Sequence, residues 1–187
     1  MLVQEMCNIV YTIWIRNFIG KVGENTRFER PLSLQGGGQR RIKVGSYTYL
    51  CHHCILGCWE KYGKDECYDP EIIIGNHCSI GEYCHITAIN RITIGDGLLT
   101  GRFVYIGDNA HGGLSLEEAK IPPHKRKLTS KGEIKIGRNV WIGDKVSIFG
   151  GVTIGDNVII GAGSIVTHDL PDNCLAVGAP AKILKQL

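Results

Sequence analysis

The sequence predicts an all-β solenoid in which short parallel strands stack as successive coils. A six-residue unit, [Ile/Val]-Gly-x-x-[small apolar]-x, recurs through the second half of the chain. Glycine supplies 25 of the 187 residues, which is nearly twice its average share, whereas proline supplies only 6. A period of six suits neither an α-helix nor an alternating strand. A short strand followed by a tight turn, three times per coil, satisfies it.

The repeat is most regular between residues 134 and 170. The first and fifth positions of each unit should point inward and form ladders between coils about 4.8 Å apart. The first positions are Ile136, Ile142, Ile148, Ile154, Ile160 and Val166, and the fifth are Val140, Val146, Val152, Val158, Ser164 and Leu170. An earlier block keeps the rule and predicts that Cys78, Cys84, Asn90, Leu98, Val104 and Ala110 also point inward. Less regular copies of the unit occur at 21–25 and 42–45.

The two ends of the chain depart from the repeat and are expected to cap it. Residues 1–20 lack the basic start and clean apolar run of a secretory signal, and they are too interrupted for a membrane span. We expect an N-terminal cap at 1–20, the solenoid at 21–174 and a C-terminal cap at 175–187. Membrane contact by the first segment is possible but not indicated. Eight cysteines would suit disulfide bonds, but without a secretory signal we expect a cytoplasmic protein whose thiols are reduced.

The repeat is interrupted once, at 112–133. Two prolines and the basic run from His124 to Lys127 indicate an excursion from the coil, and the apolar residues that flank them in IPPHKRKL predict an ordered arm. His111 stands at its entrance, at the outward sixth position of its unit, and two glycines follow it. His85 holds the same position in an earlier unit. A histidine placed like His111 either performs chemistry or hydrogen-bonds the loop, and its position alone leaves both readings open.

A wider motif resembles a known family. The run VYIGDNAHGG, the loop, and then WIG, GAGSIVT and GAPAK at this spacing resemble the hexapeptide-repeat acetyltransferases. They are most similar to the galactoside/maltose O-acetyltransferase group and to sugar O-acetyltransferases of polysaccharide assembly. The resemblance covers more than half of the chain. It implies a left-handed parallel β-helix, a homotrimer with shared active sites, and direct acetyl transfer from acetyl-CoA to a sugar hydroxyl without a metal.

The resemblance also implies roles for individual residues. His111 would be the general base, because a neutral imidazole can take the proton of an attacking hydroxyl. Candidate acceptor-binding residues are Asn109, His85 and Tyr83. The acetyl-CoA groove would be lined by Trp141, Asp144 and Ala162 along the pantetheine, Thr167 and His168 at the nucleotide end, and Lys182 and Lys185 at the phosphates. His168 stands where a lysine is usual, and the two lysines stand where some relatives have arginine, so weaker phosphate contacts are expected.

Several alternatives remain open at this stage. The acceptor could be an amine, as in amino-sugar or antibiotic N-acetylation, or the chain could be a scaffold without activity. The cluster Cys51, His52, His53, Cys54, Cys58 and Cys67 suggests zinc without matching a standard pattern. A carbonic-anhydrase-like site would need three histidines, and His77, His85 and His111 are poorly spaced for it. A covalent acyl-cysteine route is set aside because Cys78 and Cys84 should face inward. A net charge of +3 without a basic, aromatic-rich stripe argues against nucleic acid.

Overall fold

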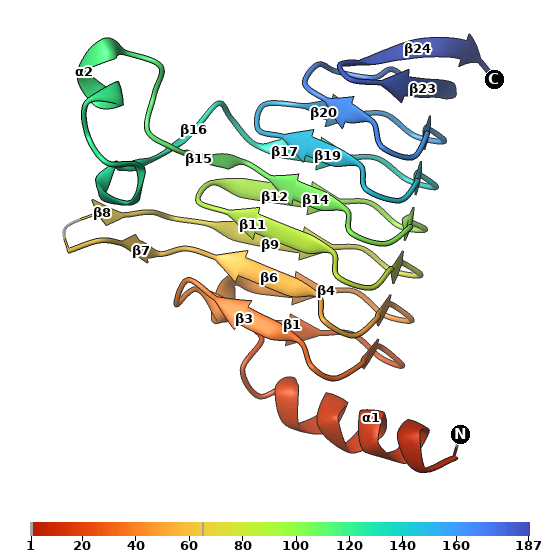
Figure 1. Cartoon of the computed structure of the whole chain (residues 1–187). Coiled ribbons are helices and arrows are strands. Elements are labelled where there is room, and N and C mark those ends of the chain that lie inside the picture. Colours follow the sequence, from red (N-terminus) through yellow and green to blue (C-terminus); the bar gives the residue numbers. More distant parts are fainter. Residues whose placement is uncertain (1, 65) are drawn as a thin grey trace.

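The chain folds as a three-sided column of stacked coils (Figure 1). The structure is a computed structural model that describes residues 2–64 and 66–187. It confirms the predicted left-handed parallel β-helix. Each coil passes through three sheets in turn, and each strand pairs in parallel with the equivalent strand of the next coil.

Each of the three sheets is formed by strands of successive coils. The first sheet holds β1 (Lys21–Val22), β4 (Ile42–Val44), β9 (Glu71–Ile74), β12 (Arg91–Ile94), β17 (Ile134–Ile136) and β20 (Thr153–Ile154). The second holds β2 (Arg27–Phe28), β5 (Tyr49–Leu50), β10 (Ser79–Ile80), β13 (Leu99–Thr100), β18 (Trp141–Ile142), β21 (Ile159–Ile160), β23 (Cys174–Gly178) and β24 (Ala181–Gln186). The third holds β22 (Ile165–Val166), β19 (Ser147–Phe149), β14 (Tyr105–Gly107), β11 (His85–Ala88), β6 (Ile55–Cys58) and β3 (Ser33–Gln35).

Residues at equivalent positions of successive coils stack as ladders that fill the interior of the column. In the first sheet the buried ladder runs through Val44, Ile74, Ile94, Ile136 and Ile154. The prediction that Asn90 and Ala110 point inward is wrong, because both are exposed. At that corner the buried carboxylate of Asp108 accepts hydrogen bonds from the backbone N–H groups of Ile89 (2.8 Å) and Asn90 (2.9 Å). The chain therefore turns over a polar group there, and the small-residue position faces outward.

The corner between the first and second sheets is built from residues that tolerate positive φ. Asn139, Asn157 and Asn173 adopt φ of 56°, 58° and 57°. Their side chains form a ladder in which Asn139 donates to Asn157 (3.3 Å) and Asn157 donates to Asn173 (2.8 Å). Asparagine suits this corner because it enters the left-handed region at low cost and its amide pairs with the next coil.

Different elements cover the two ends of the column. α1 (Leu2–Ile15) lies across the first coil, where Thr12 and Ile15 are buried and the Thr12 hydroxyl accepts the Phe28 N–H (3.0 Å). At the other end β23 continues the second sheet, and β24 returns antiparallel to it. In the described part of the chain, no helix combines the length and hydropathy needed to cross a bilayer.

Two insertions leave the column at the same edge (Figure 1). The first is the antiparallel hairpin of β7 (Lys61–Tyr62) and β8 (Glu66–Cys67). The second is the arm, which contains β15 (Asn109–His111), α2 (Leu116–Ala119), a 3₁₀ turn at Pro123–Lys125 and β16 (Leu128–Ser130). A further 3₁₀ turn, Gln39–Arg41, precedes β4. The hairpin and the arm lie side by side, and they enclose the site described next.

Candidate active site

A cavity of about 220 Å³ lies where the two insertions meet the third sheet. β11 and β14 form its floor, the segment around β7 forms one wall, and β15 and β16 form another. It is lined by Trp59, Tyr62, His85, Thr87, Tyr105, Asn109, His111 and Leu128. The cavity brings together three residues that the sequence predicts for the site, His111, Asn109 and His85.

His111 lies on β15, outside the regular coil, and its ring is held by Tyr62. Nδ1 of His111 is 3.3 Å from the Tyr62 hydroxyl, which in turn donates to the backbone carbonyl of His124 (3.3 Å). Because the hydroxyl hydrogen points to His124, the Tyr62 oxygen is left to accept, and Nδ1 of His111 carries the proton. This tautomer, inferred from the hydrogen-bond network, leaves Nε2 with a free lone pair.

His85 lies on β11 and is half-buried. Its Nε2 atom is buried without a hydrogen-bond partner among the described residues, and its ring lies edge-on to Tyr105 at 5.5 Å. Burial lowers the pKa of His85 below its ordinary value, so the ring is neutral near pH 7. A buried polar atom without a partner is costly, so a ligand that hydrogen-bonds Nε2 would be favoured here.

Thr87 is the centre of a small polar network on the cavity floor. Its hydroxyl oxygen accepts from the Trp59 indole N–H (3.2 Å) and from the Asn109 amide (3.2 Å). With both acceptor positions used, the Thr87 hydrogen remains available to donate. A Cβ at Gly57 would lie 2.9 Å from this hydroxyl and 3.0 Å from the Trp59 nitrogen, so the network needs glycine at that position.

The arm is anchored to the first insertion. The Tyr68 hydroxyl accepts the Leu128 N–H (2.9 Å) and donates to the Leu128 carbonyl (3.1 Å). Lys127 forms an ion pair with Glu66 (2.8 Å). At the arm's entrance, Gly112 N–H donates to the Lys127 carbonyl (2.8 Å). These contacts hold the strand that carries His111 in a defined place.

The acetyl-CoA candidates lie elsewhere on the protomer. Trp141 is exposed on β18, between Leu99 and Ile159 of the neighbouring coils. Asp144 and Ala162 lie in the turns that precede β19 and β22, at the amino end of the third sheet, whereas His111 follows the carboxyl end of β14. One protomer therefore does not bring this group and His111 into one cavity.

The same turns are tight enough to need glycine. A Cβ at Gly101 would lie 2.0 Å from Oδ1 of Asp144, and one at Gly143 would lie 2.6 Å from the Ala162 nitrogen. Beyond β22, the Thr167 hydroxyl lies 2.9 Å from Nδ1 of His168. Lys182 and Lys185 are exposed on β24. The arrangement is an open, glycine-lined edge with two lysines near its end.

Tyr83 does not line the cavity. It occupies the corner between the second and third sheets at φ 58°, where its ring stacks between His53 (4.8 Å) and Phe103 (4.9 Å). This position is at the opposite end of β11 from Thr87. Within one protomer Tyr83 therefore belongs to the turn and not to the site around His111.

Five of the residues that line the cavity were not among the candidates selected from the sequence. They are Trp59, Tyr62, Thr87, Tyr105 and Leu128. The sequence does indicate an insertion near Trp59 and Tyr62, because the coil from Val44 to Ile74 is longer than the next coil, from Ile74 to Ile94. That extra length is the β7–β8 hairpin. Thr87 and Tyr105 face outward from the coil and Leu128 lies in the arm. The repeat pattern identifies inward residues only, so it does not separate site residues from other outward ones.

The cysteines do not form a reactive or metal-binding cluster. All eight are free, and Cys54 and Cys58 face the core. Burial raises the pKa of Cys51 to about 11 and the pKa values of Cys54 and Cys58 to about 12, so these thiols are protonated near neutral pH. Among the residues that the structure describes, no three His, Cys, Asp or Glu side chains gather as metal ligands. Within one protomer, the described part of the chain therefore does not gather the cysteines and histidines of 51–67 as metal ligands.

Comparisons with known proteins agree with this architecture. The family model described as "Bacterial transferase hexapeptide (six repeats)" matches residues 133–168. The galactoside O-acetyltransferase of Escherichia coli K12 is 42% identical over 125 residues, which cover 64% of this chain and 56% of that protein. WbbJ of the same organism, whose name assigns it to lipopolysaccharide biosynthesis as an O-acetyl transferase, is 35% identical over 119 residues, or 62% of this chain and 60% of WbbJ. The chain thus spans less than two thirds of the length of these relatives.

Solved structures show the same fold over nearly the whole chain. A maltose O-acetyltransferase from Clostridium difficile 630 superposes with a TM-score of 0.61 at 28% identity, covering 92% of this chain and 72% of that one. AntD, an N-acyltransferase from Bacillus cereus in complex with dTDP and 3-hydroxybutyryl-CoA, superposes with a TM-score of 0.72 at 22% identity, covering 93% and 86%. The chain is thus similar to bacterial hexapeptide-repeat transferases in its coils, in its six-residue unit and in the sequence of residues 133–168.

Proposed function

We propose that this protein transfers an acetyl group from acetyl-CoA to a hydroxyl of a sugar, with His111 as the general base. The observation that carries the proposal is the chain of contacts from His111 through Tyr62 to the His124 carbonyl. It leaves Nε2 of His111 able to accept a proton beside the polar groups of His85, Thr87 and Asn109. The O-acetyltransferase relatives support a sugar hydroxyl as the acceptor, and WbbJ supports a role in surface polysaccharide biosynthesis.

The proposed reaction is a direct transfer. Nε2 of His111 takes the proton of the acceptor hydroxyl as its oxygen bonds to the thioester carbonyl carbon. The carbon–sulfur bond then breaks, and His111 returns the proton to the departing thiolate. Such general-base assistance contributes about 10²–10⁴-fold to the rate. Tyr62 keeps the Nδ1 proton in place throughout, so the ring presents the same nitrogen at both steps.

His85, Thr87 and Asn109 are suited to orient the acceptor. Nε2 of His85 has no partner among the described residues, and the hydroxyl of Thr87 has a hydrogen to donate. Sugars present several hydroxyls that both donate and accept, so they can satisfy such groups together. Tyr83 joins this set only if a neighbouring protomer brings it near.

The acetyl-CoA site is proposed to lie between protomers of a homotrimer. The separation of His111 from Trp141, Asp144 and Ala162 within one chain supports this, because a shared site would unite them. Thr167, His168, Lys182 and Lys185 would hold the nucleotide end. No metal takes part in the proposed step, and reduced thiols fit a cytoplasmic location, where acetyl-CoA is available.

The test is a product assay with the purified protein, acetyl-CoA, and a panel of sugars, sugar nucleotides and amino sugars. Mass spectrometry of the acetylated product is preferred to thiol titration because Cys67 is exposed and would react. We expect O-acetylation of at least one sugar, and a loss of about 10²-fold or more for His111→Ala with unchanged fold and CoA binding. Acetylation of amines alone would overturn the hydroxyl assignment, and an unchanged rate in His111→Ala would overturn the mechanism.

A further inference from the structure

The outer face of α1 is strongly apolar although it faces away from the column. Val3, Met6 and Val10 are 75%, 65% and 66% exposed, and Ile13 and Trp14 are 64% and 53% exposed. These side chains are not needed for capping, since Thr12 and Ile15 make the buried contacts on the opposite face. A contiguous apolar face of this kind is typical of a surface that contacts a partner or a membrane.

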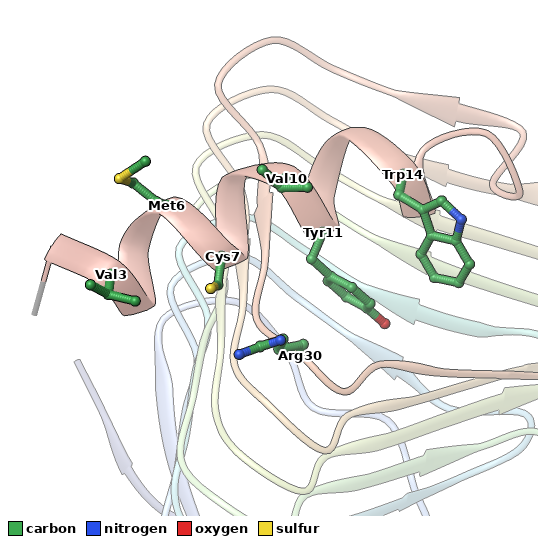
Figure 2. Close-up of a pocket in the computed structure, with 7 residues that line it drawn as sticks. All are labelled: Val3, Met6, Cys7, Val10, Tyr11, Trp14 and Arg30. Atoms are coloured by element: carbon green, nitrogen blue, oxygen red, sulfur yellow. The ribbon is translucent and has the colours of Figure 1, made fainter.

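Two grooves flank the helix and widen this face. The first, of about 550 Å³, runs along Val3, Met6, Cys7, Val10, Tyr11, Trp14 and Arg30 (Figure 2). The second, of about 420 Å³, lies beyond Trp14 and is lined by Tyr11, Trp14, Ile15, Phe18, Leu32, Leu34 and Gln39. Trp14 separates them and packs edge-on against Phe18 at 4.9 Å. Aromatic rings of this kind favour the zone where an apolar layer meets water.

Exposed basic residues lie just after α1 and along the first coil that it covers. Arg16, Lys21, Arg30 and Arg40 are exposed, and none forms an ion pair with a described residue. Arg30 lies in the first groove itself (Figure 2). The acidic residues here are largely engaged: Glu5 pairs with Arg27 (3.1 Å), and Glu29 accepts the His52 N–H (3.1 Å), leaving Glu24 as the exposed carboxylate of the first coil.

We propose that α1 seats this end of the protein on the surface of an anionic lipid bilayer. The apolar side chains and the two grooves would enter the acyl boundary, and the four basic residues would face the phosphate headgroups. With 14 residues, α1 is too short to cross the hydrocarbon layer, so it would lie in the plane of the interface. A second copy of the chain suits this face less well. Two copies meeting here would bring Arg16, Lys21, Arg30 and Arg40 against the same positive charges.

Vesicle flotation of the full chain tests the proposal without any assay of activity. We expect binding to phosphatidylcholine vesicles that contain phosphatidylglycerol, weaker binding at high salt, and little binding to phosphatidylcholine alone. Met6→Ser with Val10→Ser should abolish flotation. Arg30→Gln with Arg40→Gln should lower the partition coefficient about fivefold for each charge removed. Leu114→Ser with Leu116→Ser changes two apolar residues of the arm that are even more exposed than Met6 and Val10, and it should have no effect.

Three results would overturn the proposal. The first is equal binding, or none, on neutral and anionic vesicles. The second is unchanged flotation both of Met6→Ser with Val10→Ser and of Arg30→Gln with Arg40→Gln. The third is a drop in particle mass by light scattering for Met6→Ser with Val10→Ser while flotation persists, which would identify the face as a contact between copies. Because every substituted residue is exposed, melting curves of the variants should match those of the parent. If Met6→Ser with Val10→Ser fails to fold, the arginine variant decides the question.

Discussion

The hydroxyl of Tyr62 lies 3.3 Å from Nδ1 of His111, although 49 residues separate them in the chain. Tyr62 belongs to the β7–β8 hairpin and His111 to the arm, so the contact joins the two insertions. The hydroxyl also reaches the backbone of His124, farther along the same arm. The orientation of the candidate base is therefore set by a segment that is not part of the repeat.

Tyr62→Phe should lower kcat about two- to tenfold and leave KM nearly unchanged. The variant removes one hydrogen bond, worth about 0.5–1.5 kcal/mol, that orients the His111 ring, and it keeps the aromatic ring that lines the cavity. Steady-state kinetics with the acceptor found in the panel would measure this. Tyr47→Phe, which changes an exposed ring stacked on His77, is the matched control. If Tyr62→Phe raises KM alone, or does nothing, Tyr62 does not position His111.

Tyr68→Phe should loosen the arm while the column stays intact. The substitution leaves the N–H and carbonyl of Leu128 without the phenol, which costs about 1–3 kcal/mol locally. Hydrogen exchange at 127–130 should accelerate, and trypsin should cut sooner within the basic run from Lys125 to Lys127. Exchange in β19 serves as the internal reference. Equal acceleration in both places would mean that the variant destabilises the whole fold instead.

Acidification should destabilise the protein in part through His85. Burial lowers its folded pKa, so between that value and the ordinary value of about 6.5 the unfolded chain binds more protons. The free energy of unfolding therefore falls as the pH drops below about 6.5. Urea unfolding at pH 7 and pH 5 should show a smaller pH effect in His85→Gln than in the parent. Identical pH effects in the two proteins would show that His85 titrates alike in both states.

Trp141→Ala should raise KM for acetyl-CoA about tenfold and change kcat little. An exposed aromatic ring on β18 adds binding area for a ligand that lies along the edge, without touching the reacting atoms. Titration with CoA, followed calorimetrically, gives the same comparison without turnover. His111→Ala should leave this affinity intact. An affinity equal to that of the parent would remove Trp141 from the proposed groove.

Ile148→Ala should lower the free energy of unfolding by about 2–5 kcal/mol. Ile148 is fully buried on β19, and truncation leaves a cavity in a tightly stacked ladder. Denaturant unfolding at matched chain concentration measures the change. Leu114→Ala, at a fully exposed position of the arm, should stay within about 0.5 kcal/mol of the parent. A small effect at Ile148 would indicate that the coils repack around the missing atoms.

The fold was predictable because one rule governs most of the chain. A β-branched residue every six positions can be buried only when equivalent residues of successive coils stack. The spacing of Ile136 and Ile154 therefore predicts that these two residues pair. The rule failed at Asn90, where the buried Asp108 carboxylate binds the backbone, and at Ala110, which has already entered strand β15 of the arm. Desolvation raises the pKa of Asp108, and the N–H donors oppose that shift. A polar group that replaces apolar packing at one corner leaves no trace in a hydrophobic period.

The site was predictable only where a residue interrupts the repeat. His111 and Asn109 stand where the arm departs, and His85 shares the outward sixth position with His111, so all three could be selected from the sequence. Tyr62 could not, because its approach to His111 depends on how two insertions fold against each other. Likewise, no sequence pattern shows that Thr87 lies beneath Asn109, since the two meet only through the stacking of neighbouring coils.

The reversal of direction at β24 has a consequence for how the protein behaves at high concentration. A parallel column ends in a row of unpaired backbone groups, and such a row can template the next molecule into a growing filament. β24 occupies that row on β23 and presents Lys182 and Lys185 at the new boundary. Positive charge on β24 discourages another molecule from pairing with this edge of the second sheet, so the hairpin of β23 and β24 protects that edge against association between molecules.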